Sequence, residues 1–264
     1  NGRKINFISL DDNYAPPKTL EQARKLVEQD KVLFIFAPLG TPTNSAIHKY
    51  MNQKKVPQLF VQTGASKWGN PKDFPWTMGW QPNYFSEGKV FARAILEGQP
   101  KGKIAVLYQN DDFGKDYLSG LEAGLGDKKN MIVARETYEV TDPTVDSQIV
   151  KLKASGADVF VNVAVPKFAA QAIKKAAEMS WKPTHYLVQV ASSVGSTLTP
   201  AGLDNSVGLI TTAFFKDPSD PQWKNDKAFL EYQEWFKKYL PGSDATDSFY
   251  IQGYINAQTV AHVI

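Results

Sequence analysis

The sequence contains no cysteine and only three histidines, and these shortages exclude several kinds of site. Without cysteine the chain can form no disulfide, no thiolate nucleophile and no Cys-ligated zinc site. The histidines, His48, His185 and His262, lie far apart in the sequence. We therefore interpret them as solvated or core-edge residues, with a metal trio or a catalytic histidine as the alternative.

The familiar motifs of enzymes and nucleotide-binding proteins are also missing. No Walker loop or G-x-G-x-x-G follows an apolar run, and there is no G-x-S-x-G or H-E-x-x-H. The acid pairs Asp11-Asp12 and Asp111-Asp112 precede turn residues, where we interpret them as turn formers and N-caps rather than acid–base pairs. We expect no catalytic residue, no metal and no cofactor.

The sequence also has no large excess of charge of one sign and no long apolar run. Thirty Lys and Arg face 27 Asp and Glu, and the net charge of +3 is scattered along the 264 residues. This distribution gives no basic stripe for nucleic acid. No apolar run approaches the roughly 18–20 residues that cross a bilayer, so we expect no membrane insertion of this segment.

What the sequence does contain is an alternation of short apolar runs with segments of helical period, which is typical of a doubly wound α/β protein. A Thr19 capping box with Gln22 and an Asp142 N-cap before Pro143 predict two helix starts. We predict strands at residues 4–10, 32–36, 58–61, 103–107, 131–138, 159–163, 186–189 and 208–212. We predict helices at residues 20–29, 44–54, 83–97, 115–125, 145–155, 167–179, 223–239 and 247–263.

Two segments have the character of lobe boundaries. The aromatic, proline-flanked residues 75–82 separate two strand groups, and residues 211–215 precede the helical tail. We expect two parallel-sheet lobes joined by a hinge, with residues 1–79 plus 213–264 in the first lobe and 80–212 in the second. The chain starts next to a predicted strand and stops inside a helical pattern, so we expect both ends to be cuts through a domain.

Two strand–turn–helix units in the first seventy residues carry the best candidate site. Small polar turns follow the strands at 32–36 and 58–61, and they contain Leu39-Gly40-Thr41 and Gly64-Ala65-Ser66. Backbone N–H groups at such turns, aided by the helix dipole, favour an anion. The turns predict a pocket for a carboxylate, with plain strand–helix connections as the alternative.

Aromatic residues gather near the predicted crossings. Trp80, Tyr84 and Phe113 each lie at a strand end or a helix start. We predict that they form a cleft wall that buries an apolar or aromatic ligand body, with ordinary core packing as the alternative.

The order of motifs resembles that of a known family. The motifs are residues 1–5, the Asp11-Asp12 turn, the Gly40 and Gly64 turns, and residues 77–79, 105–108, 112–116 and 157–160. Together they resemble type I periplasmic solute-binding proteins of ABC importers, closest to the leucine/isoleucine/valine-binding group (the extracellular ligand-binding receptor family). The resemblance covers essentially the whole chain. It implies two lobes that close on a ligand, permease subunits as partners, and a periplasmic or extracellular, lipid-anchored location.

The resemblance also implies a ligand set. Its carboxylate position corresponds to Leu39, Gly40, Thr41, Gly64 and Ser66, and its second-lobe wall to Phe113, Ala164, Val165 and Ser192. The family begins with a strand and helix upstream of residue 1, so we expect the first lobe to lack them here.

One departure from the family pattern bears on the ligand. Amino-acid-binding members carry acids after the first crossing and on the second lobe, where this chain has Gln81 and the run 190–193. A buried ammonium without such a partner costs several kcal/mol. We therefore expect an aromatic or apolar carboxylate without an α-ammonium. The alternatives are an amino-acid-binding protein, the sensor domain of a receptor, and an α/β hydrolase.

Overall fold

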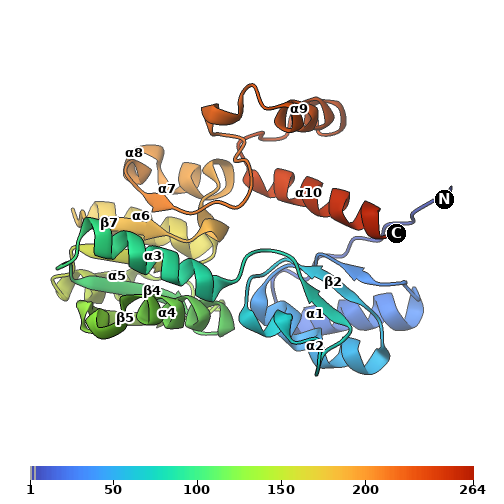
Figure 1. Ribbon diagram of the computed structural model, residues 1–264, viewed down its shortest axis with the longest axis horizontal. Helices are drawn as coiled ribbons and strands as arrows, with labels where there is room; N and C mark the ends of the chain where they lie inside the picture. Colours follow the sequence, from blue (N-terminus) through green and yellow to red (C-terminus); the bar gives the residue numbers. More distant parts are fainter. Residues whose placement is uncertain (1, 3) are drawn as a thin grey trace. The chain divides into compact units, whose positions relative to one another are not determined.

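A computed structural model describes Gly2 and residues 4–264 (Figure 1). The chain divides into two compact units, Asn1–Asn83 and Tyr84–Ile264. Each unit has a parallel sheet with helices in its connections, which confirms the predicted α/β fold with parallel sheets. In this division residues 213–264 lie with the second unit, and their predicted return to the first lobe stays a prediction.

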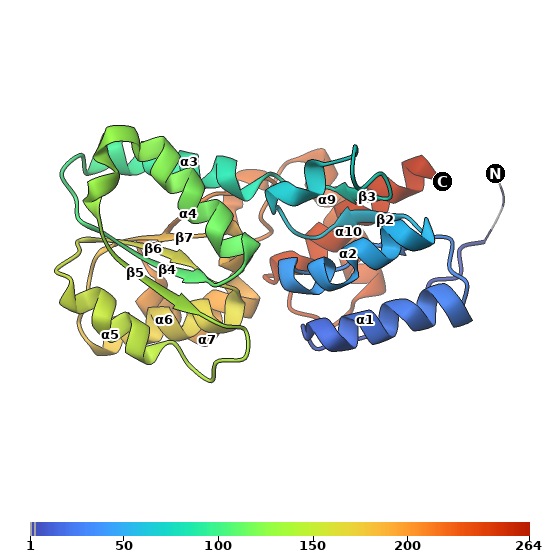
Figure 2. The ribbon, with the colours of Figure 1, turned by 90° about the horizontal axis from the view of Figure 1, so that it is seen from below.

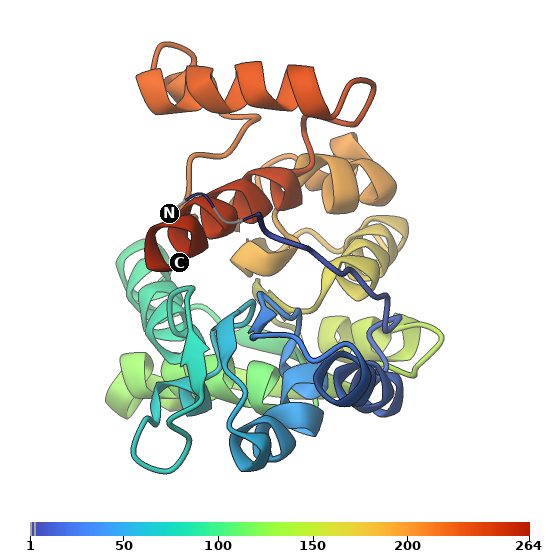
Figure 3. The same cartoon turned by 90° about the vertical axis from the view of Figure 1, so that its right-hand side faces the viewer.

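The first unit is a small three-stranded sheet with two long helices. Its elements are α1 (Pro16–Arg24), β1 (Ile35–Phe36), α2 (Thr41–Lys54), β2 (Gln58–Val61) and β3 (Thr77–Gly79). The strands pair in parallel in the order β1-β2-β3. Helices α1 and α2 lie on one side of these strands (Figure 3). A core of Ala23, Ile47 and Met51 joins the two helices.

Two strand predictions for the first unit are wrong or incomplete, and a third strand was not predicted. Residues 4–10 form no strand, and Ile5 and Phe7 remain 70% and 69% exposed. An apolar run becomes a strand only where a neighbour supplies hydrogen bonds, and none of the strands in the described part of the chain pairs with it. The predicted strand at 32–36 shortens to β1. Residues 75–82, predicted as a crossing, contain β3, and the Gln58 N–H donates to the Trp76 carbonyl at 2.7 Å.

The predicted capping box at Thr19 is also wrong, because α1 already begins at Pro16. Proline tolerates the first helical turn, where its missing N–H has no helical partner. The Thr19 hydroxyl instead donates to Asp12 Oδ2 at 2.6 Å. The interpretation of Asp11 and Asp12 as turn formers is confirmed, since Asp12 Oδ1 accepts from the Tyr14 N–H at 2.9 Å and Asp11 accepts from the residue two positions on.

The second unit is a doubly wound sheet whose strand order is β5-β4-β6-β7-β8, all parallel. Its strands are β4 (Ile104–Gln109), β5 (Ile132–Tyr138), β6 (Val159–Val163), β7 (Thr184–Leu187) and β8 (Ile210–Thr211). Its helices are α3 (Tyr84–Gly98), α4 (Asp112–Leu125), α5 (Asp146–Ala154), α6 (Pro166–Glu178), α7 (Thr199–Ala201), α8 (Leu203–Ser206), α9 (Lys227–Tyr239) and α10 (Ser248–Val263). Figure 2 shows α3 and α4 on one face of the sheet and α5 and α6 on the other.

Helices α3 and α4 approach each other closely because glycines line their contact. A Cβ on Gly120 would lie 2.1 Å from the Phe85 carbonyl oxygen, and one on Gly88 would lie 2.4 Å from the Tyr117 carbonyl oxygen. Any side chain at these positions would push the helices apart. The sequence therefore fixes a tight helix pair over one face of the sheet.

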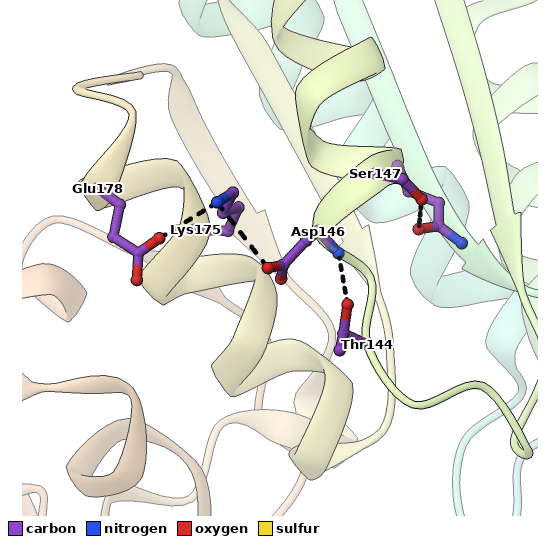
Figure 4. Close-up of polar contacts among 6 residues, drawn as sticks. Thr144, Asp146, Ser147, Lys175 and Glu178 are labelled. Carbon is purple, nitrogen blue, oxygen red and sulfur yellow. Dashed lines mark hydrogen bonds and ion pairs between the residues drawn. The ribbon is translucent and has the colours of Figure 1, made fainter.

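The predicted Asp142 N-cap is wrong, because α5 begins at Asp146 and Asp142 Oδ2 instead accepts from the Glu139 N–H at 2.9 Å. An exposed ionic cluster lies where α5 starts (Figure 4). Lys175 Nζ on α6 lies 3.8 Å from Asp146 Oδ2 and 3.3 Å from Glu178 Oε2. The Asp146 N–H donates to Thr144 Oγ1 at 3.2 Å. This cluster connects the start of α5 with the last turn of α6.

The last two helices of the chain are α9 and α10, and α9 lies above α10 in Figure 3. A cluster of buried side chains fills the space between them, formed by Phe229, Tyr232, Phe236 and Ile251. Their N-caps are Asp226 and Asp247, whose side chains accept backbone N–H groups of the first turn. Among the described residues, no helix combines the length and the apolar character needed to cross a membrane.

Candidate ligand-binding site

The two turns predicted to bind an anion lie side by side in the first unit. Leu39 and Gln62 form an isolated parallel bridge beyond the ends of β1 and β2. The Gly40 N–H donates to the Gln62 carbonyl at 3.2 Å, and the Gln62 N–H donates to the Pro38 carbonyl at 2.9 Å. The backbone of the first turn is therefore fixed to the backbone of the second.

A pair of buried hydroxyls closes this junction. Thr41 Oγ1 and Thr63 Oγ1 lie 2.6 Å apart, and either can be the donor. The pair has two O–H hydrogens and uses one between its members. Ser66 and Leu39 are exposed, whereas Gly40, Gly64 and Ala65 are buried. Thr63 was absent from the predicted site, although its place between a strand end and Gly64 is the same signal that singled out Thr41.

The helix behind the first turn makes the local potential positive. Helix α2 begins at Thr41, directly after Gly40, and has no acidic residue in its first turn. Lys67 Nζ lies 3.0 Å from Ser45 Oγ, and that hydroxyl donates to the Thr41 carbonyl at 2.7 Å. A cation at the positive end of a helix dipole is unfavourable alone, and a bound anion there would be favoured by both.

Gly40 has a conformation and a neighbour that only glycine permits. Its φ is +95°, and a Cβ at this position would lie 2.2 Å from Tyr14 Cε2 and 2.9 Å from Thr43 Oγ1. The half-buried Tyr14 ring therefore packs directly on the turn. This contact explains why the turn needs glycine at the N-cap of α2.

The predicted aromatic wall is divided between the two units. Trp80 and Gln81 follow β3 in the first unit and are half-buried. Tyr84 and Phe113 belong to the second unit and are 3% and 2% exposed. Their ring centroids are 5.1 Å apart, and both pack on Tyr117. In this structure the two rings form core packing, the alternative that the sequence left open, and their role as a ligand wall stays a prediction.

A chain of buried and partly buried hydrogen bonds connects two predicted ligand segments of the second unit. Asp111 Oδ1 caps α4 by accepting from the Phe113 N–H at 3.0 Å, and Asp111 Oδ2 accepts from Gln109 Nε2 at 2.7 Å. The Tyr138 hydroxyl donates to Gln109 Oε1 at 3.0 Å and accepts from the Val165 N–H at 3.0 Å. We call the three residues that connect Phe113 to Val165, namely Asp111, Gln109 and Tyr138, the relay. The N-cap role predicted for Asp111 is confirmed, and burial raises the pKa of its carboxyl.

Ser192 lies in a short turn after β7. Its hydroxyl and its N–H both reach the Gln189 carbonyl, at 2.8 and 3.2 Å. Ala164 is buried at the end of β6, next to the half-buried Val165. These residues all follow the carboxyl ends of parallel strands, where ligands bind in open α/β sheets.

Sequence reasoning missed the buried acid Glu87 on α3. Glu87 is 8% exposed, and its carboxylate accepts from the hydroxyls of Tyr117 and Thr212 at 2.5 Å each and from the Gln189 N–H at 3.1 Å. Burial raises the pKa of Glu87, while these hydrogen bonds oppose the shift. The signal was present, since residue 87 falls on the apolar stripe of α3.

Two of the histidines are buried and neutral. Burial lowers the pKa of His185 to about 3, and burial together with the Lys67 charge lowers the pKa of His48 to about 4. His48 packs on Trp68 and Phe74, and His185 packs on Phe160. Within residues 2 and 4–264, no three His, Asp or Glu side chains gather as metal ligands would.

Comparison with known proteins places the chain in a class. The family described as "Periplasmic binding protein" matches residues 1–264, and the chain belongs to that family. This confirms the resemblance that the motifs indicated. No curated protein gives a match.

Solved structures share the fold at low identity. One is a possible leucine/isoleucine/valine-binding protein from Rhodopirellula baltica SH 1, with 21% identity, a TM-score of 0.79, and coverage of 94% of this chain and 67% of that chain. Another is an extracellular ligand-binding receptor from Rhodopseudomonas palustris HaA2, with 20% identity, a TM-score of 0.80, and coverage of 97% and 71%. A third is an ABC transporter solute-binding protein from R. palustris in complex with benzoate, with 19% identity, a TM-score of 0.82, and coverage of 97% and 68%.

Proposed function

We propose that this chain is the non-catalytic solute-binding component of an ABC importer. It closes its two lobes by hinge motion around a small aromatic or apolar carboxylate that lacks an α-ammonium. Its partners are the permease subunits of the importer, and it works in the periplasm or, lipid-anchored, outside the cell. Family membership supports the binding role, and the finer statements rest on the site.

The observation that carries the proposal is the junction of the two turns. The Thr41 and Thr63 hydroxyls meet at the N-terminus of α2, whose first turn has no acid. Lys67 lies outside α2, but its Nζ contacts Ser45 Oγ, one turn along that helix, and adds positive charge there. Hydroxyls, free N–H groups and a helix N-terminus are the donors that a carboxylate needs.

The ligand class is inferred from the residues that would face the ammonium group of an amino-acid ligand. Gln81 and the run 190–193 stand where amino-acid-binding relatives are expected to carry acids. Glu87 is an acid on α3, but both of its oxygens accept hydrogen bonds from the protein itself. A relative of the same fold has been solved with benzoate, which supports an aromatic acid as ligand.

Isothermal titration tests the proposal with benzoate, leucine and benzamide. We expect benzoate to bind, and leucine and benzamide to bind at least about tenfold more weakly, because one brings an ammonium and the other lacks the negative charge. Thr63→Val should weaken benzoate binding by about tenfold, since it removes one buried hydroxyl of the pair. Thr137→Val, an exposed threonine on β5, is the matched control and should leave binding unchanged.

Tight binding of leucine without any response to aromatic acids would overturn the ligand class and favour the alternative of a branched-chain amino-acid-binding protein. Benzoate binding that Thr63→Val leaves intact would overturn the placement of the acid at the two turns. The sensor-domain alternative predicts the same binding but a fused signalling segment, which the complete gene would reveal.

A further inference from the structure

The carboxylate of Glu87 connects three segments of the second unit that are distant in sequence. Oε2 accepts from Tyr117 on α4 at 2.5 Å, and Oε1 accepts from both the Gln189 N–H at 3.1 Å and the Thr212 hydroxyl at 2.5 Å. Gln189 follows β7 and Thr212 follows β8. One oxygen atom is therefore shared by the two segments that leave the last strands of the sheet.

A buried carboxylate is destabilising unless hydrogen-bond donors compensate for its lost hydration. Taking an isolated charge out of water costs far more than burying a neutral polar group, unless donors surround it. The two carboxylate oxygens of Glu87 accept from three donors. Because Glu87 is only 8% exposed, water would not fully replace a donor that is removed. The positions of Gln189 and Thr212 are therefore tied to each other through this group.

Each of the two tied segments has a place in the proposed site. Gln189 begins the turn that carries Ser192, and the Gln189 carbonyl accepts both the hydroxyl and the N–H of Ser192. Thr212 lies in residues 211–215, which the sequence indicates as a lobe boundary. A displacement at Thr212 would pull on Oε1 of Glu87, and the same oxygen holds the start of the Ser192 turn.

We propose that Glu87 is a positioning residue that couples the segment leaving β8 at Thr212 to the turn bearing Ser192. The coupling is a property of the second unit alone. Its role in ligand binding rests on the proposed function, because it takes Ser192 as a ligand contact. The chemistry needs no proton transfer, only an acceptor with two lone pairs directed at two donors.

The test compares two adjacent threonines in the ligand-free protein by amide hydrogen exchange. Thr212→Val removes the hydroxyl that reaches Glu87, whereas Thr211→Val removes an exposed hydroxyl that reaches only the Thr212 carbonyl. We expect Thr212→Val to speed exchange at the Gln189 and Ser192 amides by about tenfold, and Thr211→Val by less than about twofold. Equal effects of the two variants would overturn the proposal.

A second variant separates coupling from general loosening. Glu87→Met keeps an unbranched side chain of similar size but removes both acceptor oxygens, including the one shared by Gln189 and Thr212. In that background Thr212→Val should change exchange at Gln189 by less than about twofold, because the connection is already weakened. The same tenfold effect in both backgrounds would show that Thr212 acts on the turn by another route, and would overturn the assignment to Glu87.

Titration with benzoate then distinguishes the two proposals. Weaker benzoate binding in Thr212→Val but not in Thr211→Val supports the role of Glu87 in the ligand site. If neither benzoate nor leucine binds the wild-type chain while the exchange coupling is present, the proposed function fails and the coupling through Glu87 stands. If benzoate binds and the coupling is absent, the inference about Glu87 fails and the proposed function stands.

Discussion

The two units use different means to hold their predicted ligand segments. In the first unit, strands of two to four residues end in turns joined by backbone bonds and by the hydroxyls of Thr41 and Thr63. In the second unit, the six-residue β4 ends near the half-buried Asp111, and the segments after β7 and β8 meet the buried Glu87. The oxygens of both acids accept from surrounding N–H and O–H groups. The first unit presents donors at its turns, and the second encloses its acceptors.

Under the proposed function, this difference favours the first unit as the place where the acid group of the ligand binds. A carboxylate brought to the junction of the first unit meets hydroxyls, a helix N-terminus and Lys67. A carboxylate brought to the second unit would come near acids of its own sign, while an apolar body would find rings there. We therefore expect substitutions at the turns of the first unit to weaken binding of the ligand's carboxylate. Substitutions in the second unit should act on the free energy of unfolding and on the packing of that unit.

The largest effect is expected at the contact of α3 with α4. Gly120→Ala places a Cβ 2.1 Å from the Phe85 carbonyl oxygen, so the two helices must separate. We expect a loss of more than about 3 kcal/mol in the free energy of unfolding, measured by urea denaturation. Gly98→Ala, at a glycine with open space around it, is the control and should stay within about 0.5 kcal/mol. Similar losses in both variants would contradict the tight packing.

Gly40→Ala is the corresponding change in the first unit. It forces a side chain into φ +95° and against the Tyr14 ring, at a combined cost of about 2–3 kcal/mol. Because the turn must move, we expect benzoate binding to weaken by at least about tenfold as well. Gly2→Ala, where the backbone also has a positive φ but nothing lies within 4 Å, separates strain from contact. Unchanged benzoate binding in Gly40→Ala would break the assignment of the acid group to this unit.

Tyr138→Phe removes the central hydroxyl of the relay and leaves Gln109 Oε1 and the Val165 N–H without it. We expect a loss of about 2 kcal/mol in the free energy of unfolding. Faster amide exchange should appear at both Phe113 and Val165, the two ends of the relay. Tyr186→Phe is the control, since Tyr186 is equally buried but packs on Phe91 on the other face of the sheet. Exchange that changes at Val165 alone would show that the relay does not connect the two segments.

Acidification tests the buried histidine of the second unit. The pKa of His185 is about 3 in the folded chain and 6.5 in its ordinary state, so only the unfolded chain binds its proton between these values. The stabilisation is complete above pH 6.5 and is lost as the pH falls toward 3. Between pH 7 and pH 5 we expect a loss of about 1–2 kcal/mol from this group. His185→Leu should flatten the pH dependence, and His262→Leu, at an exposed position, should not.

The smallest effect is expected at the surface cluster of α5 and α6. Lys175→Gln breaks the contacts with Asp146 and Glu178, both of which are about half exposed or more. We expect a change below about 1 kcal/mol in the free energy of unfolding, and a further decrease of this difference in high salt. A larger loss would mean that this cluster holds α5 against α6.

Sequence reasoning predicted the fold better than the site, for a physical reason. Strands β2 and β6 were predicted with their observed bounds, because a buried parallel strand is a continuous apolar run whatever surrounds it. The run at residues 4–10 has the same pattern but no pairing partner among the described strands, and a single sequence does not reveal partners. Pairing also made a strand of Thr77–Gly79, which has only three residues and no apolar run.

The site was predictable where it follows the backbone and unpredictable where it depends on packing. The turns at Gly40 and Gly64 follow from strand ends, so their adjacency could be expected. Glu87 and Tyr138 act through partners between 27 and 125 residues away in sequence, which no local pattern encodes. A charged residue on an apolar helix stripe, as at position 87, is the one local sign of such a contact.

The contact between Tyr14 and Gly40 offers a spectroscopic handle on the first unit. A Cβ on Gly40 would lie only 2.2 Å from Tyr14 Cε2, so a ring carbon packs against the turn where an acid is proposed to bind. Fluorotyrosine carries its ¹⁹F nucleus on that ring position, and fluorine resonances shift strongly with nearby charge. Labelled at residue 14, the protein would report occupancy of the turn by NMR, with no need for a chromophore on the guest molecule.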